Sequence, residues 1–167
     1  MTKLSIRPLE ERDLMGVQAV ARATWPVTYK DILPLDTINT FLKKAYHPDA
    51  LRKAWESDCQ LEPRGFFVAC AGERVIGYTQ FVPSATEIEL TRIYVLSSYQ
   101  QRGVGKALVR YGLAQQTKQL PLMVWVEKEN EGACRFYETC GFTFVKEIED
   151  RSLGIVTWLS QYQLTSA

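Results

Sequence analysis

The stretch that decides the fold is Ile93-Tyr94-Val95, followed by Tyr99-Gln100-Gln101-Arg102-Gly103-Val104-Gly105-Lys106. β-Branched and aromatic residues lead into a short polar turn with two glycines, and an amphipathic segment follows. This order predicts a strand, a tight loop and the start of a helix. Glycine allows a ligand to approach the backbone closely, and the free N–H groups of a first helical turn favour an anion. The segment is therefore predicted to bind a phosphate group.

The spacing of this loop excludes two common phosphate-binding motifs. Ala107 stands where a P-loop requires Ser or Thr, and Leu108 stands where a dinucleotide fingerprint requires a third small residue. The pattern that fits is [QR]-x-x-G-x-[GA], formed by Gln100, Gly103 and Gly105. An ordinary strand-to-helix turn also explains these residues. With this pattern the chain resembles the GCN5-related N-acetyltransferases (GNAT), whose loop of this form binds the pyrophosphate of acetyl-coenzyme A.

A second segment, Asn130–Phe142, resembles the second signature of the same family, N-x-x-A-x-x-F-Y-x-x-x-G-F. Asn130 is a favourable N-cap residue, and Gly141 stands where a left-handed residue commonly ends a helix. The apolar positions between them share one helical face; they are Ala133, Phe136, Tyr137 and Cys140. Taken alone, Asn130 is a simple cap and Tyr137 a core aromatic residue. Both signatures in the same order favour the family resemblance.

The composition is consistent with one compact cytoplasmic domain that comprises residues 1–167. A chain of 167 residues with 46% hydrophobic residues can bury a substantial core. The net charge of +1 gives no indication of a nucleic-acid surface. The four cysteines form no CxxC pair, and a single histidine argues against a metal site. The N-terminus lacks the apolar core of a signal peptide, and no apolar run is long enough to span a bilayer.

Hydrophobic periodicity predicts a mixed α/β order. The expected strands are residues 4–7, 66–71, 75–82, 87–95, 122–127, 142–149 and 155–161, and the expected helices are residues 11–23, 103–119 and two further ones capped by Asp36 and Asp49. Residues 25–29 are expected to break the first helix, and Gly72-Glu73 to turn a hairpin. The resemblance implies the GNAT fold, with a central, mostly antiparallel twisted sheet of six to seven strands and about four to five helices.

Acetyl transfer to an amine sets three chemical requirements. An alkyl amine is mostly protonated at neutral pH, so a carboxylate or a water molecule must accept a proton. The oxyanion needs a hydrogen-bond donor, which the N–H of Val95 could supply at the end of its strand. The departing thiolate needs a proton, and by resemblance Tyr137 supplies it. The expected reaction is direct transfer in a ternary complex, without a covalent intermediate on the enzyme.

Glu89 is the favoured candidate for the base. It stands eleven residues before Gln100, the base position of the histone-acetylating branch of the family. Glu87 shares its strand face, and a solvated face with salt-bridge partners is the alternative interpretation of both carboxylates. Two other branches of the family have a glutamate as the base at other positions. Those positions hold Trp125 and Arg92 here, so neither pattern is met.

The resemblance implies a set of residues that bind acetyl-coenzyme A. They are Ile93, Tyr94, Val95, Gln100, Gln101, Arg102, Gly103, Val104, Gly105, Lys106, Asn130 and Tyr137. Within the family, residues 23–30, 41–46 and 88–95 resemble the bacterial PaiA-type polyamine acetyltransferases. This resemblance implies a small polyamine such as spermidine as the acceptor. Carboxylates and aromatic faces bind such a polycation, and the candidates are Trp25, Tyr29, Glu87 and Glu89.

Two other functions remain as alternatives. One is a peptide or protein N-terminal acetyltransferase. The ribosomal type of that enzyme carries a glutamate at the position that Trp125 occupies here, so Trp125 argues against the ribosomal type only. The other is a non-catalytic regulatory module that binds coenzyme A, against which the intact Asn130 and Tyr137 argue. The expected partner is a small-molecule amine rather than a nucleic acid or a membrane. Dimers are common in the family, so a homodimer is a further expectation.

Overall fold

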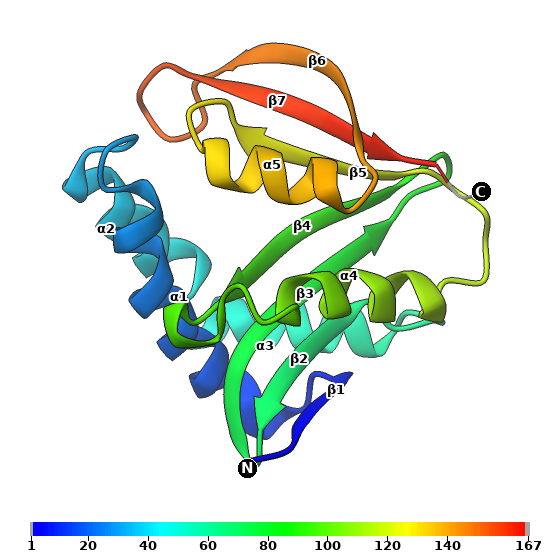
Figure 1. The fold of residues 1–167 in the computed structure, drawn as a ribbon. Helices are drawn as coiled ribbons and strands as arrows, with labels where there is room; N and C mark the ends of the chain where they lie inside the picture. Colours follow the sequence, from blue (N-terminus) through cyan, green and yellow to red (C-terminus); the bar gives the residue numbers. More distant parts are fainter. Residues whose placement is uncertain (1, 166–167) are drawn as a thin grey trace.

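One seven-stranded sheet organises the computed structural model, which describes residues 2–165. The strand order is β1-β2-β3-β4-β5-β7-β6, and only the pair β4 and β5 is parallel (Figure 1). The strands are β1 (Leu4–Pro8), β2 (Phe66–Ala71), β3 (Arg74–Pro83), β4 (Ile88–Val95), β5 (Leu122–Glu127), β6 (Thr143–Asp150) and β7 (Thr157–Leu164). The α-helices are α1 (Leu14–Tyr29), α2 (Leu35–Ala45), α3 (Pro48–Cys59), α4 (Val104–Gln115) and α5 (Glu131–Thr139). This architecture agrees with the predicted fold class.

Helices cover both faces of the sheet. Every residue of β2 is buried, because alternate side chains pack against opposite layers. Phe66 and Val68 join the core formed with α1, α2 and α3, whereas Ala69 joins the core formed with α4. Within the described residues, no helix is both long enough and apolar enough to cross a membrane.

The predicted hairpin is confirmed. Strands β2 and β3 pair in antiparallel register from Phe66 with Gln80 to Ala71 with Arg74. Gly72 turns the chain between them with a φ of +60°, in the left-handed region that glycine adopts without strain.

The predicted end of the first helix is wrong. Helix α1 continues through Pro26 to Tyr29, although a proline inside a helix removes one hydrogen bond and costs about 3 kcal/mol. The last turn is retained because it carries buried aromatic residues. The Trp25 ring stacks on Phe41 of α2 with the ring centroids 4.3 Å apart, and it lies 4.4 Å from the Tyr29 ring. Tertiary packing outweighs the local propensity here.

Other predicted boundaries also need correction, among them the last strand, which is Thr157–Leu164 rather than residues 155–161. Pro34 and His47 occupy the cap positions of α2 and α3, whereas Asp36 and Asp49 lie in the first turns. Carboxylates in a first turn interact favourably with the helix dipole. Asp36 and Asp49 therefore indicate where the two helices begin, although neither is the N-cap. Helix α4 ends at Gln115 rather than residue 119, and Gln116 is already extended. The exposed residues after it bury no apolar face that would hold a helix.

Candidate active site

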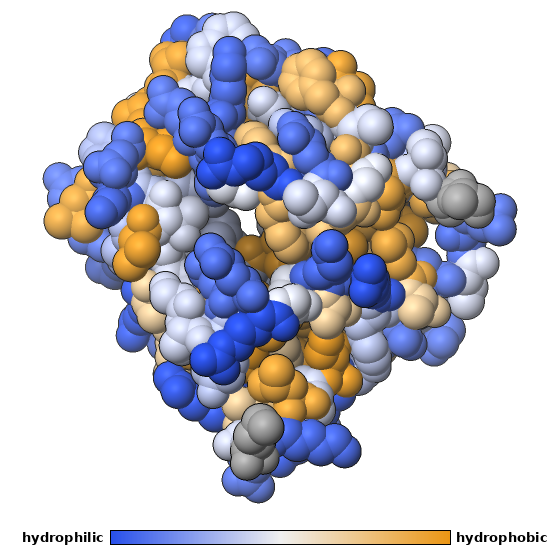
Figure 2. All heavy atoms as spheres, viewed as in Figure 1, coloured by the Kyte–Doolittle hydropathy of each residue, from blue (hydrophilic) through white to orange (hydrophobic). Residues whose placement is uncertain are grey.

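A cleft opens where β4 and β5 separate. The two strands pair only at Ile88 with Leu122 and at Glu89 with Met123, and they diverge beyond this point (Figure 1). The resulting cleft has a volume of about 520 Å³ and is lined from α1, β4, α4, β5 and α5. Figure 2 shows the surface hollowed between the part that carries α4 and the part that carries α5. Strands that separate leave backbone groups without ladder partners, so an amide-containing ligand can pair with them.

The free edge of β4 carries backbone donors that face this cleft. The N–H of Leu96 donates to the carbonyl of Ile76 in β3 at 2.9 Å. Successive N–H groups of a strand point to opposite edges, so the N–H of Val95 points to the side that β5 has left. The same alternation directs the N–H of Ile93 there. Ile93, Tyr94 and Val95 all line the cleft.

The loop after β4 is held in a special conformation. The side chain of Gln100 donates from Nε2 to the carbonyl of Val95 at 2.9 Å, which fastens the loop to the end of the strand. Gln101 has a φ of +60° and Gly103, the N-cap of α4, a φ of +81°. A left-handed residue other than glycine is strained and often marks a functional site. Helix α4 therefore begins with its first N–H groups at the mouth of the cleft.

The space at residue 105 leaves little room for a side chain. A Cβ atom on this residue would lie 3.1 Å from the ring of Phe136 in α5. Gly105 and Phe136 both line the cleft. Val104 is buried with Leu108 in the core under α4, so it anchors the helix rather than facing the cleft. The guanidinium of Arg102 lies over the ring of Tyr99 at 5.5 Å, and Arg102 does not line the cleft.

Helix α5 supplies the opposite wall. Asn130 caps it, and its Oδ1 accepts a hydrogen bond from the N–H of Ala133 at 3.2 Å. Gly141 follows the helix with a φ of +96°. Tyr137 lines the cleft, is 5% exposed and contacts the rings of Phe136 and Phe142. Burial raises the pKa of Tyr137 well above its ordinary value, so the phenol keeps its proton at neutral pH.

One aromatic residue of α1, Tyr29, lines the cleft beside Tyr94 of β4. The hydroxyls of Tyr29 and Tyr94 form a hydrogen bond of 2.9 Å, and both residues line the cleft. Trp25 does not line it; its buried ring fills the space between Phe41 and Tyr29. The indole Nε1 of Trp25 has no hydrogen-bond partner among the described residues.

Glu87 and Glu89 lie at the closed end of the gap between the strands. Neither lines the cleft directly, and both are half-buried. Burial raises the pKa of Glu89, and the charge of Glu87 raises it further. The register places a β-bulge at Thr91, since Arg92 pairs with Gln80 and Leu90 pairs with Phe81. The bulge brings Arg92 and Tyr94 to the same sheet face as Glu89, which simple alternation along the strand does not predict.

Comparison with known proteins identifies the family of this site. A sequence model of the acetyltransferase (GNAT) family matches residues 29–142. The chain belongs to this family. The predicted enzyme class, an N-acetyltransferase, is thereby confirmed.

Named relatives of this GNAT chain include a spermidine N(1)-acetyltransferase. That protein, from Thermoplasma acidophilum, is 28% identical over 142 residues, which are 83% of this chain and 88% of the relative. An uncharacterised N-acetyltransferase of Lactobacillus delbrueckii subsp. lactis is 32% identical over 162 residues, 88% of both chains. The crystal structure of PaiA N-acetyltransferase from Thermoplasma acidophilum in complex with coenzyme A superimposes with a TM-score of 0.83. It is 23% identical and covers 97% of this chain and 99% of its own, which confirms the predicted GNAT fold.

The GNAT cleft gathers most of the predicted site residues. Those that line it are Tyr29, Ile93, Tyr94, Val95, Gln100, Gln101, Gly105, Asn130 and Tyr137, whereas Trp25, Glu87, Glu89, Arg102, Gly103, Val104 and Lys106 lie around it. Phe136 and Trp125 also line the cleft, although sequence reasoning assigned neither a role in the site. The family signature contains Phe136, so that residue could have been found. Trp125 stands at the base position of another branch of the family, so the resemblance could have placed it at the site as well.

Proposed function

We propose that this GNAT protein transfers the acetyl group of acetyl-coenzyme A to a primary amine of a small molecule, by direct transfer in a ternary complex. The observation that carries the proposal is the cleft between β4 and β5, which combines free backbone donors with the buried hydroxyl of Tyr137. In this proposal the whole chain serves as one acetyltransferase domain in the cytoplasm, and the free cysteines are compatible with that location.

The loop and the strand edge hold the cosubstrate in this proposal. The backbone N–H groups from Gln101 to Lys106 bind the pyrophosphate, because they lie at a helix N-terminus whose Gly103 cap has a φ of +81°. The edge of β4 from Ile93 to Val95 pairs with the pantetheine amides, and Asn130 contacts the cofactor arm. The complex of PaiA with coenzyme A supports this assignment.

The chemistry then uses three groups of this chain. The amine nitrogen loses a proton through water to Glu89, which lies beside the cleft lining and whose raised pKa makes it a better base than an exposed carboxylate. The nitrogen attacks the thioester carbon, and the N–H of Val95 donates to the oxyanion. As the C–N bond forms and the C–S bond breaks, Tyr137 gives its proton to the departing thiolate and is reprotonated by the second proton that the nitrogen loses on becoming an amide.

A polyamine such as spermidine is the favoured acceptor class. The relative that is named a spermidine acetyltransferase supports this choice, as does the resemblance of residues 23–30, 41–46 and 88–95 to the PaiA type. Cleft-lining aromatic rings, Tyr29, Tyr94 and Trp125, offer faces to a cation.

The test measures thiol release from acetyl-coenzyme A over a panel of polyamines, amino acids, aminoglycosides and peptides. We expect turnover with small primary amines, highest with polyamines. Turnover only on peptide N-termini would favour the N-terminal acetyltransferase. A rise in melting temperature with coenzyme A, without turnover on any amine, would favour the regulatory module.

A further inference from the structure

Two tyrosine hydroxyls meet at the wall of the cleft. The hydroxyl oxygens of Tyr29 in α1 and Tyr94 in β4 lie 2.9 Å apart and share one hydrogen bond. Both residues line the cleft, and Tyr29 is 8% exposed. Burial raises the pKa of Tyr29 to about 12 and the pKa of Tyr94 well above its ordinary value. Both hydroxyls are therefore protonated and neutral at neutral pH.

A hydroxyl pair of this kind keeps hydrogen-bonding capacity for a ligand. A tyrosine hydroxyl both donates and accepts, and the shared hydrogen bond uses one donor and one acceptor position of the pair. Each oxygen then retains a lone pair that can accept a further hydrogen bond. A neutral primary amine has two N–H groups and one lone pair, so it can donate to both oxygens at once. Its lone pair then points away from the two hydroxyls.

The pair stands at the end of the cleft where the proposed function places acetyl transfer. Tyr94 directly precedes Val95, whose N–H points to the open edge of β4. Tyr137 lines the same cleft, and after burial itself Tyr29 is the neighbour that adds most to the raised pKa of Tyr137. The charge of Glu127, at the end of β5, adds in turn to the pKa increase that burial causes at Tyr29. The oxyanion donor, the proton donor for the thiolate and the hydroxyl pair therefore lie together.

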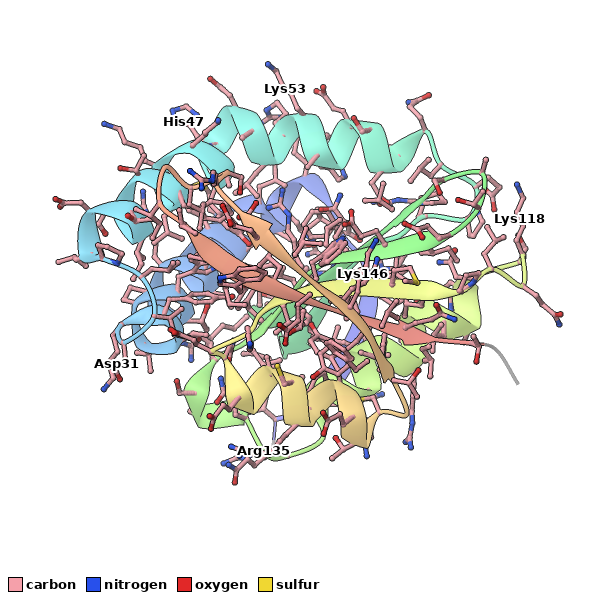
Figure 3. All side chains as sticks on the ribbon, turned by 90° about the horizontal axis from the view of Figure 1, so that it is seen from above. Asp31, His47, Lys53, Lys118, Arg135 and Lys146 are labelled. Carbon is pink, nitrogen blue, oxygen red and sulfur yellow. The ribbon has the colours of Figure 1, made fainter. Side chains whose placement is uncertain are left out.

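Aromatic packing fixes the position of the two hydroxyls. The last turn of α1, which continues through Pro26, carries Tyr29 to β4. The Trp25 ring lies 4.4 Å from the Tyr29 ring and 5.6 Å from the Tyr94 ring, so one indole packs against both members of the pair. The exposed Asp31, two residues after Tyr29, projects at the periphery (Figure 3). Its carboxylate does not face the pair, where it would favour the ammonium form of an acceptor. Side chains locked by packing can orient a substrate group.

We propose that the hydroxyls of Tyr29 and Tyr94 position the acceptor nitrogen and select primary over secondary amines. This role rests on the proposed function and deepens it. Once the nitrogen has lost its first proton, its two N–H groups donate to the two hydroxyl oxygens, and its lone pair points across the cleft toward the thioester carbon. The hydroxyls bind these hydrogens without taking them up, so the proton balance is that of the proposed function. A secondary amine has one N–H group and satisfies one oxygen only, which leaves its lone pair less well oriented.

The experiment measures kcat/KM by thiol release for butylamine and for N-methylbutylamine, with the wild-type protein, Tyr29→Phe and Tyr94→Phe. The wild type should prefer butylamine by about tenfold, as for one additional hydrogen bond. Each variant keeps the ring but loses one oxygen, so kcat/KM for butylamine should fall about tenfold, while kcat/KM for N-methylbutylamine changes less than about twofold. The ratio between the two amines should therefore approach one, which a purely structural defect would not produce.

A second buried hydroxyl pair in the same core is the matched control. The hydroxyl of Tyr78 donates to that of Tyr46 at 2.8 Å, both residues are buried, and neither lines the cleft. Tyr78→Phe breaks this pair as Tyr29→Phe breaks the other, so it should lower the melting temperature to a similar degree. It should leave kcat/KM for both amines within about twofold of the wild type. If Tyr29→Phe fails to fold, Tyr94→Phe tests the same pair from β4.

The outcomes separate this inference from the proposed function. Absence of thiol release with every amine in the wild type would contradict the proposed function itself. Turnover without a preference for butylamine, or a preference that stays the same in Tyr29→Phe and Tyr94→Phe, would overturn only the role of the hydroxyl pair. A steric preference against the methyl group would give that second result, because both rings stay in place. Melting temperature and coenzyme A affinity, measured on each variant, show whether the fold and the cosubstrate site are intact.

Discussion

Tyr137 illustrates how surroundings determine the role of a single residue. A tyrosine hydroxyl in water has a pKa near ~10, and burial among Phe136, Phe142 and Tyr162 raises the pKa of Tyr137 further. The neutral phenol can donate a proton, but it is too weakly acidic to serve as a base at neutral pH. A donor is what a departing thiolate requires, so burial suits Tyr137 to the proposed role.

Replacement of Tyr137 by Phe tests this role. It keeps the ring and its packing but removes the proton, so kcat should fall by about 10²-fold or more, as for other general acids. The dissociation constant for coenzyme A should change by less than about threefold. Steady-state kinetics and calorimetric titration measure the two quantities. Tyr111→Phe, at a half-buried tyrosine that packs on Phe67, is the matched control and should retain activity. Equal losses of turnover and coenzyme A affinity would contradict the donor role.

The loop between β4 and α4 depends on its backbone more than on its side chains. Gln101 and Gly103 both have left-handed φ values, and Gln100 fastens the loop to the carbonyl of Val95. Nothing lies within 4 Å of the position that a Cβ atom on Gly103 would take. The requirement for glycine there comes from the backbone conformation and not from a lack of space.

Gly103→Ala tests this requirement. A left-handed alanine costs about 1–2 kcal/mol, so a loop that must keep this conformation to bind pyrophosphate should lose about 5- to 30-fold in coenzyme A affinity. Gly154 offers a matched control, because it has the same φ of +81° and equally open surroundings in the turn before β7. Gly154→Ala should lower the melting temperature to a similar degree and leave coenzyme A affinity unchanged. Unchanged affinity in Gly103→Ala would show that the loop conformation is not needed for binding.

At the scale of the molecule, buried ion pairs connect the sheet to the helices on one face. Asp13, 4% exposed, accepts hydrogen bonds from Arg7 Nη1 at 2.6 Å and Nη2 at 2.9 Å, which ties β1 to the start of α1. Asp58 of α3, 2% exposed, accepts from the N–H groups of Gly65 and Phe66 at the start of β2 and pairs with Arg64. Such carboxylates lose their partners only when the layers separate, so they couple the helices to the sheet.

The Arg7–Asp13 ion pair should make the free energy of unfolding depend on pH in the acid range. Burial alone would raise the pKa of Asp13, but the hydrogen bonds from Arg7 and from the N–H of Glu10 lower it below its usual value. A carboxyl group whose pKa is lower in the folded than in the unfolded protein stabilises the fold at pH values above its unfolded pKa of about 3.9. This stabilisation is lost as the pH falls through the pKa of the folded protein.

Asp13→Asn should therefore reduce the free energy of unfolding by about 1–3 kcal/mol at neutral pH and by less in acid. Urea unfolding at a series of pH values measures the difference. Glu11→Gln, which breaks the exposed pair with Arg52, is the control and should change stability little. A loss in Asp13→Asn that is the same at every pH would exclude the proposed linkage.

Most of the local elements and the family can be recognised from the amino-acid sequence alone. The loop pattern at Gln100–Gly105, the cap at Asn130 and the turn at Gly72 depend on neighbours within a few residues, so they can be recognised without the fold. The continuation of α1 through Pro26 depends on tertiary contacts, since the Trp25 ring of the last turns stacks on Phe41 of α2. The tertiary structure also determines which residues share one face of the sheet beside the cleft. The bulge at Thr91 redirects Arg92 and Tyr94, and the register of β4 with β5 places Glu127 on the face of Glu89. Register and bulges depend on pairing between distant strands, and no local pattern in the sequence records that pairing.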